Sequence, residues 1–267
     1  MLAYLRRCHA SVADQAGGSV EHIVVDGGSS DGSAEFVRQA PDIVGLVGPD
    51  AGMYDAINKG LRLAKGEIVA YLNCDEQYLP GTLRDVKAAF AAEPAVDMVA
   101  GDTLLIRPDG SLLAYRKAYP LPRALMLVSP LQAQSSSLFF RRRIFDDGHA
   151  FDASLKDLGD YELLERLLGC KYRLRICRRY LSVFTMTGAN REFGPNAQRE
   201  AAQLRSRLPG IMVWLGGPLR LVRWTIKLLA GAYWQPMPLV YSVYTSSQAS
   251  ARRVFVVDRA SFRWRQA

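Results

Sequence analysis

Two carboxylates and an amide stand together just after an apolar run of this sequence. The run 68–72 is followed by Asn73, Asp75 and Glu76. In open α/β sheets, ligands bind at the carboxyl ends of the strands, so a strand ending here would deliver these acids to a binding cleft. Carboxylate oxygens are the ligands that Mg²⁺ and Mn²⁺ prefer, and such an ion can hold a diphosphate. The segment also has an ordinary structural explanation, because Asp and Asn cap helices and Pro80 suits the first turn of one.

Two further acids, Asp26 and Asp102, follow β-rich runs in the same way. Asp26 ends the run 20–26, and Asp102 follows the run 96–100. If the three strands are parallel, their acids meet at one edge of the sheet. The loop at 27–33 is rich in Gly and Ser and allows a nucleotide to approach closely. It has neither the spacing of a Rossmann GxGxxG loop nor the Gly-Lys-Ser/Thr of a P-loop, which argues against NAD binding and ATP hydrolysis.

Strands and helices alternate through the first hundred residues, which is typical of a mostly parallel, doubly wound α/β sheet. The periodicity of apolar residues and the turn residues between runs predict helices at 2–15, 33–39, 53–64 and 80–92, and strands at 20–26, 43–47, 68–72 and 96–100. Beyond Asp102 the same signals predict a hairpin at 104–115, strands at 137–141, 172–177 and 181–186, and helices at 120–129, 157–168 and 195–207.

The composition is that of a folded protein with anionic partners. Hydrophobic residues make up 49% and charged residues 22% of the 267 residues, and the formal net charge is +8. A basic balance favours nucleotides, phospholipids or nucleic acid as partners. The basic stretches 141–143 and 173–179 contain few aromatic residues, so we expect solvated strand faces there and no nucleic-acid partner.

Cysteine and histidine usage argues against a zinc site and for a reducing compartment. The 4 cysteines form no CxxC pair, and the 3 histidines are scattered along the chain. Residues 1–15 lack the apolar core of a signal peptide. We therefore expect a cytoplasmic protein.

The composition changes from Leu208 onward to Trp, Leu, Gly and Arg. The longest charge-free run there, 209–219, is too short to span a bilayer. In a helix, Arg220, Arg223 and Lys227 fall within an arc of roughly 60°, with Leu, Ile, Val and Trp elsewhere. Such a helix either lies in a membrane surface, which would place the protein at the inner face of the membrane, or packs on the main domain with solvated basic residues. Both interpretations stay open.

Several blocks in a fixed order resemble the family 2 inverting glycosyltransferases, which have a GT-A fold. The blocks are 24–33, 50–60 with 64–68, 72–76, 134–142, and 151–152 with 159–164. Several ordered blocks together are far more specific than any one motif. The resemblance implies a GT-A-like domain at 1–192, with a nucleotide-binding part (1–102) and an acceptor and catalytic part (103–192). A helical extension, with a membrane-surface helix as one interpretation, would follow at 193–267.

The resemblance also implies a role for each matching residue on the donor side. Asp26 corresponds to the acid that reads the nucleobase of the donor. Asp31 either contacts the nucleoside or caps its helix, and the cap is the favoured interpretation. The other donor-side positions are Gly28, Ser29, Asp55, Lys59 and Asn73.

The implied chemistry is transfer of a sugar from a UDP- or GDP-sugar, with inversion, in the synthesis of polysaccharide or glycolipid. Asp75, more than Glu76, would hold Mg²⁺ or Mn²⁺ on the leaving diphosphate. Asp160 would take the proton of the acceptor hydroxyl, although an acid there also offsets the dipole at a helix N-terminus. Gln134 and Ser135 would line the side that receives a glycan or a lipid-linked sugar.

Two departures from the family pattern open rival predictions. The first position of the DxD motif is the amide Asn73, and the strand that normally begins the family's sheet is not seen before the helix at 2–15. We expect a start site set too late or a shortened donor pocket, with 253–258 as a candidate to fill the empty strand position. The alternatives are a catalytically impaired sugar-nucleotide-binding or membrane-associated scaffold, and a nucleotidyltransferase, whose usual basic Gly-rich loop is absent.

Overall fold

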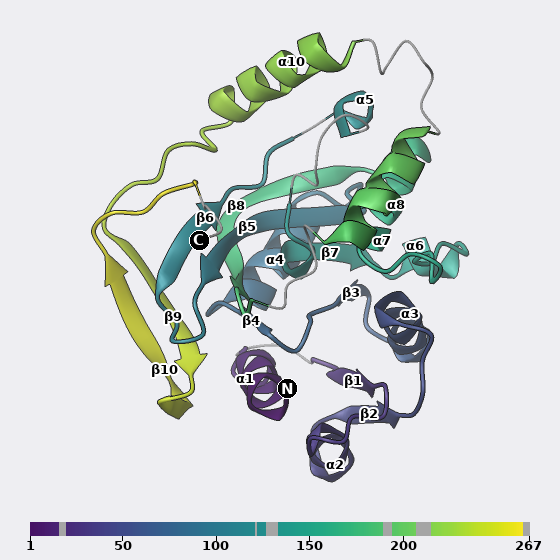
Figure 1. The fold of residues 1–267 in the computed structure, drawn as a ribbon, viewed down its shortest axis with the longest axis vertical. Helices are drawn as coiled ribbons and strands as arrows, with labels where there is room; N and C mark the ends of the chain where they lie inside the picture. Colours follow the sequence, from purple (N-terminus) through teal and green to yellow (C-terminus); the bar gives the residue numbers. More distant parts are fainter. Residues whose placement is uncertain (16–19, 121, 127–132, 189–193, 207–214, 264–267) are drawn as a thin grey trace.

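A sheet in the order β3-β7-β5-β8-β4, with β6 beside β5, forms the centre of the molecule (Figure 1). The computed structural model describes residues 1–15, 20–120, 122–126, 133–188, 194–206 and 215–263. The strands of this sheet are β3 (Ile68–Ala70), β4 (Glu76–Tyr78), β5 (Met98–Ile106), β6 (Leu112–Arg116), β7 (Leu138–Arg141) and β8 (Leu174–Thr185). Among the described residues of this sheet, only the β5–β8 pairing is parallel, while β3–β7, β5–β7, β5–β6 and β4–β8 are antiparallel. The α/β class is therefore as predicted, but the sheet is mixed and not mostly parallel.

β5 is longer than predicted and does not end before Asp102. All nine of its residues, from Met98 to Ile106, are buried, so the apolar run and the first arm of the predicted hairpin are one strand. β8 likewise joins two predicted strands and follows β5 along its length, with register shifts on either side of Asp102. Gly101 permits this close approach, because a Cβ there would lie 2.2 Å from the side chain of Leu181.

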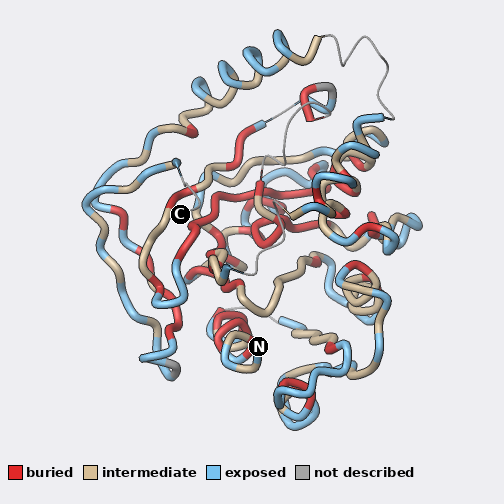
Figure 2. Tube along the Cα trace, viewed as in Figure 1, coloured by how far each residue is buried: buried red, intermediate tan, exposed pale blue. Residues whose placement is uncertain are grey.

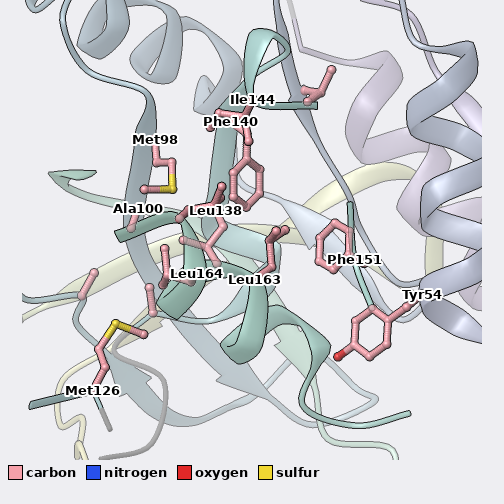
Figure 3. Close-up of a cluster of buried hydrophobic side chains, with 14 of the residues drawn as sticks. Tyr54, Met98, Ala100, Met126, Leu138, Phe140, Ile144, Phe151, Leu163 and Leu164 are labelled. Carbon is pink, nitrogen blue, oxygen red and sulfur yellow. The ribbon is translucent and has the colours of Figure 1, made fainter. Parts of the chain in front are cut away.

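Helices cover both faces of the sheet. On one face, α1 (Leu2–Ala13) and α4 (Thr82–Ala92) pack on alternate β5 residues such as Val99. On the other face, α7 (Gly159–Gly169) packs Leu163 and Leu164 on Met98 and Leu138 (Figure 3). Because both faces of the central strands are buried under helices, their apolar residues form continuous runs and do not alternate with polar residues. Shorter helical segments are α5 (Arg123–Met126), η1 (Ser135–Ser137) and α6 (Arg143–Asp146).

The first strands form a separate α/β unit. Its elements are β1 (Ile23–Asp26), α2 (Ser33–Gln39), β2 (Val44–Val47) and α3 (Met53–Leu63), and β1 pairs with β2 in parallel. Within the described ranges, β1 pairs only with β2, and β3 pairs only with β7. The segment 253–258 does not fill a position between them, because most of it belongs to the hairpin strand β10. That prediction is wrong.

The C-terminal extension is helical only in its first half. It comprises α8 (Pro195–Ser206), α10 (Gly216–Leu229) and an antiparallel hairpin of β9 (Leu239–Thr245) and β10 (Gln248–Val257). In the hairpin, Leu239, Tyr241 and Val243 are buried while Val240 is exposed, the two-residue alternation of a strand. None of the helices in the described part of the chain is long and apolar enough to cross a membrane. The predicted boundary at 192 and the end of the predicted helix 120–129 lie outside the described residues.

Candidate active site

Glu76 builds the turn that carries Asn73 and Asp75 beyond the end of β3. Its Oε2 atom accepts the N–H of Asn73 at 2.7 Å, and its own N–H donates to the Asn73 carbonyl at 3.0 Å. Glu76 is 0% exposed, whereas Asp75 is half-buried. The two neighbouring carboxylates therefore occupy different environments, and Asp75 is the one that solvent reaches.

Asp160 lies in the first turn of α7, facing a tyrosine of α3. Its Oδ1 atom accepts the N–H of Tyr161 at 2.8 Å and the hydroxyl of Tyr54 at 3.4 Å. The Tyr54 oxygen in turn accepts the backbone N–H of Asp160 at 3.3 Å. These contacts fix the orientation of the carboxylate relative to both helices.

Tyr54 is held in place by close packing on every side of its ring. It is 1% exposed and stacks on Phe151 with ring centroids 5.5 Å apart (Figure 3). A Cβ at Gly159 would lie 2.6 Å from the Tyr54 ring, so the start of α7 approaches α3 as closely as backbone permits. The Tyr54 hydroxyl is thereby presented to Asp160.

Glu76 is buried within range of the charges of Asp75 and Asp160. Burial, together with the negative charges of Asp75 and Asp160, raises the pKa of Glu76 to about 8. Burial also raises the pKa of Asp75 above its ordinary value. For Tyr71, burial and then the charge of Asp160 raise the pKa well above its usual range. The acids after β3 and the acid of α7 are therefore near enough for their charges to act on Glu76.

A network of buried hydroxyls supports the acceptor-side segment. Ser137 Oγ lies 2.6 Å from Ser182 Oγ and 2.7 Å from Thr103 Oγ1, and Ser136 Oγ lies 2.9 Å from Ser182 Oγ. All four residues are at most 1% exposed. The network fastens η1 to β5 and β8 and was not predicted, although the run of three serines was a signal for it.

Of the two predicted acceptor-side residues, Ser135 is tied to the acid site. Ser135 is buried and hydrogen-bonds the side chain of Tyr71. Burial and the charges of Asp160 and Glu76 raise the pKa of that tyrosine. Gln134 precedes η1 in extended conformation and is half-buried. Ser135 thus contacts a tyrosine whose pKa the charge of Asp160 raises, and the acceptor-side role of the two residues stays a prediction.

Asp26 shapes the glycine-rich loop that follows β1. Its Oδ1 atom accepts the N–H groups of Gly28 at 2.9 Å and Ser29 at 2.7 Å, and Gly28 adopts a positive φ of 96°. Gly27 lies against the second loop of this unit, because a Cβ there would fall 2.6 Å from Asp50 Oδ2. The two loops predicted to hold the donor are thus in contact.

Asp55 and Lys59 pair with each other at the start of α3. Their charged groups are 2.9 Å apart, Asp55 also accepts the N–H of Ala51 at 3.0 Å, and Lys59 donates to the Pro49 carbonyl at 2.9 Å. The N–H of Ala51, followed by Lys59, lowers the pKa of Asp55. In this structure, both residues build the loop at 49–52.

Asp31 stabilises helix starts. Its Oδ1 atom accepts the N–H of Ser33, the first residue of α2, at 3.1 Å, and its Oδ2 atom accepts the N–H of Leu2 at 3.0 Å. These bonds agree with the capping interpretation, although Gly32 occupies the N-cap position itself.

Asp102 is the clearest departure from the predicted cluster of acids. It lies inside β5, is 4% exposed, and accepts the N–H of Ala118 at 2.9 Å. Burial raises its pKa to about 6, against the opposing effects of that N–H and of Lys117 and Arg178. Because β5 continues past it, Asp102 is not an acid at a strand end.

Comparison with known proteins identifies the family. The sequence profile described as "Glycosyl transferase family 2" matches residues 2–154. The chain belongs to glycosyl transferase family 2. A "PGL/p-HBAD biosynthesis glycosyltransferase" of Mycobacterium bovis is 28% identical over 198 residues, 72% of this chain and 73% of that protein. "Succinoglycan biosynthesis protein ExoO" of Rhizobium meliloti is 30% identical over 187 residues, 64% of this chain and 53% of that protein.

Solved structures show that this family 2 glycosyltransferase has the predicted GT-A fold. Residues 1–349 of S. aureus TarS in complex with UDP-GlcNAc align with a TM-score of 0.56 at 17% identity, over 85% of this chain and 71% of that one. The mannosyltransferase PcManGT from Pyrobaculum calidifontis in complex with GDP-Man and Mn2+ gives 0.54 at 21% identity, over 76% of this chain and 57% of that one. At these identities the likeness concerns the fold alone.

The residues at the DxD position of this glycosyltransferase fit a metal ion that arrives with its substrate. No three side chains of the described residues form a protein-only metal site. Mg²⁺ commonly takes one or two protein carboxylates and completes its coordination with water and substrate phosphates. Asp75 supplies one solvent-reachable carboxylate, and Asn73 supplies a neutral amide next to it. Glu76 faces inward and holds the turn instead.

Proposed function

We propose that this glycosyltransferase moves a sugar from a UDP- or GDP-sugar to an acceptor hydroxyl with inversion at the anomeric carbon. The observation that supports the proposal is that Asp75 and Asp160, although 85 positions apart in sequence, both lie near enough to Glu76 for their charges to raise its pKa. Transfer with inversion requires charge neutralisation on the leaving diphosphate and a base on the other side of the sugar. These two carboxylates supply one group for each task.

Asp160 is the general base in this proposal. The acceptor oxygen bonds to the anomeric carbon, the bond from that carbon to the diphosphate oxygen breaks, and the acceptor proton passes to Asp160. Tyr54 and the N–H of Tyr161 hold the Asp160 carboxylate in one orientation. A fixed base loses less entropy on reaching the transition state than a mobile one.

Asp75 is the metal-binding residue in this proposal, with Mg²⁺ or Mn²⁺ neutralising the diphosphate. Asn73 and Glu76 position Asp75 through their shared turn. Asp26, Gly28 and Ser29 would hold the nucleoside. Their loop lies against the loop that Asp55 and Lys59 build, so the two loops would form the donor site together. The solved relatives in complex with UDP-GlcNAc and with GDP-Man and Mn2+ support this class of donor.

The acceptor that we propose is a glycan or a lipid-linked sugar, bound beside Gln134 and Ser135. The names of the relatives, a PGL/p-HBAD biosynthesis glycosyltransferase and a succinoglycan biosynthesis protein, support glycolipid or polysaccharide synthesis. We place the reaction at the cytoplasmic face of a membrane, because the C-terminal extension presents large apolar side chains to solvent.

A donor screen tests the function directly. Thermal shift with Mn²⁺ and a panel of UDP- and GDP-sugars should show one donor that raises the melting temperature, and mass spectrometry should then detect its sugar on an acceptor glycan or glycolipid. The rival is a sugar-nucleotide-binding scaffold, because Asn73 replaces a carboxylate. Donor binding without turnover on any acceptor or on water would favour the scaffold.

A further inference from the structure

α10 presents most of its large apolar side chains to solvent, while two of its three basic residues, Arg223 and Lys227, are half-buried. None of its residues is buried, and it runs along the outside of the fold (Figures 1 and 2). Its outward arc is apolar at Leu221 (66% exposed), Val222 (47%), Trp224 (51%), Leu228 (49%) and Leu229 (82%). An ordinary surface helix has the opposite arrangement, with its apolar stripe facing the core. A contiguous exposed apolar arc of this kind marks an interaction surface.

Positive charge gathers along the inward edge of the same helix. Lys227 Nζ lies 4.9 Å from the ring centroid of Tyr233 and 5.6 Å from that of Tyr119. Burial, together with the nearby charges of Arg116 and Arg223, lowers the pKa of Lys227. Arg220 is the exposed cation of α10, at the edge of the apolar arc, and it favours an anionic partner.

The apolar arc is too small for a stable contact with a second protein copy. α10 has 14 residues and is therefore about 21 Å long. A strip about 10 Å wide along it covers roughly 200 Å², well below the ~800 Å² per partner of a standard protein interface. A helix lying in a membrane interface, in contrast, needs only one apolar face and a flanking row of cations.

We propose that α10 docks into the surface of a bilayer that contains anionic lipids. The apolar arc enters the boundary of the acyl chains, and Arg220 at its edge meets the headgroup phosphates. Trp224 and the 69%-exposed Trp234 suit this boundary, where tryptophan is enriched. Leu219 and Ile226 on the inward side pack against the core cluster that contains α7. Docking therefore brings the face of the sheet that carries Asp160 toward the bilayer.

Co-sedimentation of the full chain with vesicles tests the proposal without any substrate. The probe is vesicles of equal parts phosphatidylcholine and phosphatidylglycerol, compared with pure phosphatidylcholine. The double variant Leu221→Gln/Leu228→Gln should bind the anionic vesicles about tenfold or more weakly, because two exposed leucines no longer enter the bilayer. Binding of the native protein should also fall with added salt and with Arg220→Glu.

A matched control removes exposed apolar side chains at the other end of the molecule. Val44→Thr/Leu46→Thr changes two exposed residues of β2, which lies far from α10 (Figure 1), and it should bind vesicles as the native protein does. The proposal is overturned if the native protein stays in the supernatant, if the α10 variant binds normally, or if the β2 variant loses as much. It is also overturned if the α10 variant only converts a dimer into a monomer in sedimentation velocity. Because the readout is binding, a failed donor screen would not affect it.

Discussion

The hydroxyl of Tyr54 and the carboxylate of Asp160 meet across 106 residues of sequence. Their oxygens lie 3.4 Å apart, and the Asp160 N–H reaches the same hydroxyl at 3.3 Å. One side chain of α3 thus contacts both the backbone and the carboxylate at the start of α7. Because α3 also begins at the loop that touches Gly27, Tyr54 links the proposed donor side of the site to the proposed general base.

Tyr54→Phe should slow transfer about tenfold while leaving donor affinity unchanged. The ring that packs on Phe151 and Gly159 is retained, and only the two hydrogen bonds between the hydroxyl and Asp160 are lost, together worth about 1–2 kcal/mol. Steady-state kinetics should show the loss in kcat and not in the KM for the donor.

Tyr78→Phe is the matched control for that experiment. Tyr78 is also a buried tyrosine, but it belongs to the core cluster of α1 and α4 on the other face of the sheet. Its turnover should equal that of the native enzyme. If Tyr54→Phe has native kcat, the hydroxyl does not position the base.

Asp160→Asn should lower transfer by about 10²–10⁴-fold and leave donor binding intact. The amide is isosteric and still accepts the N–H of Tyr161, but it cannot take up the acceptor proton. Turnover and the thermal shift produced by the donor should be measured on the same preparation. Turnover close to the native rate would remove Asp160 from the role of base.

Asp75→Ala should weaken metal-dependent donor binding far more than Glu76→Gln does. Asp75 is half-buried and available to a metal, whereas Glu76 is enclosed and uses Oε2 to hold Asn73. A Gln side chain keeps an oxygen for that bond. Titration of Mn²⁺ in the presence of UDP gives both affinities, and equal losses in the two variants would contradict the assignment.

The elements of this fold were predictable where local pattern alone determined them. The helix at 80–92 and the hairpin turn near Asp109 follow from periodicity and turn chemistry, and the structure confirms them. The long β5 and β8 were not predictable, because their continuity depends on each other and on the close approach at Gly101. Of the hairpin β9–β10, the segment 253–258 was predicted as a strand, but its antiparallel pairing with 239–245 was not, because that pairing is a tertiary feature.

The sequence motifs indicated candidate residues for the site but not the contacts between those residues. Asp75 and Asp160 were chosen from ordered motifs, and their catalytic roles stay predictions; in the structure the charges of both raise the pKa of Glu76. No sequence pattern indicated that Tyr54 would reach Asp160, because that contact depends on how α3 and α7 cross. Asp102 was placed at a strand end because the register shift that lets β5 continue is a tertiary feature.

Glu76 should make the protein less stable as the pH rises from about 5 to 8. In the folded state, burial raises the pKa of this carboxyl to about 8, above its ordinary value of 4.5. Between these values the unfolded chain has released the proton and the folded chain has kept it, so stability falls with increasing pH. The shift corresponds to roughly 3–5 kcal/mol across the window.

Glu76→Gln isolates this effect, because an amide does not titrate. In buffer with EDTA, the melting temperatures of the two proteins should be similar near pH 5, and the variant should become progressively more stable than the native protein toward pH 8. Asp102, whose pKa burial raises to about 6, titrates in both proteins and cancels in the comparison. A constant difference between the two melting temperatures from pH 5 to 8 would contradict the prediction. It would mean that Glu76 is already ionised in the folded protein and is paired with a donor other than the Asn73 N–H.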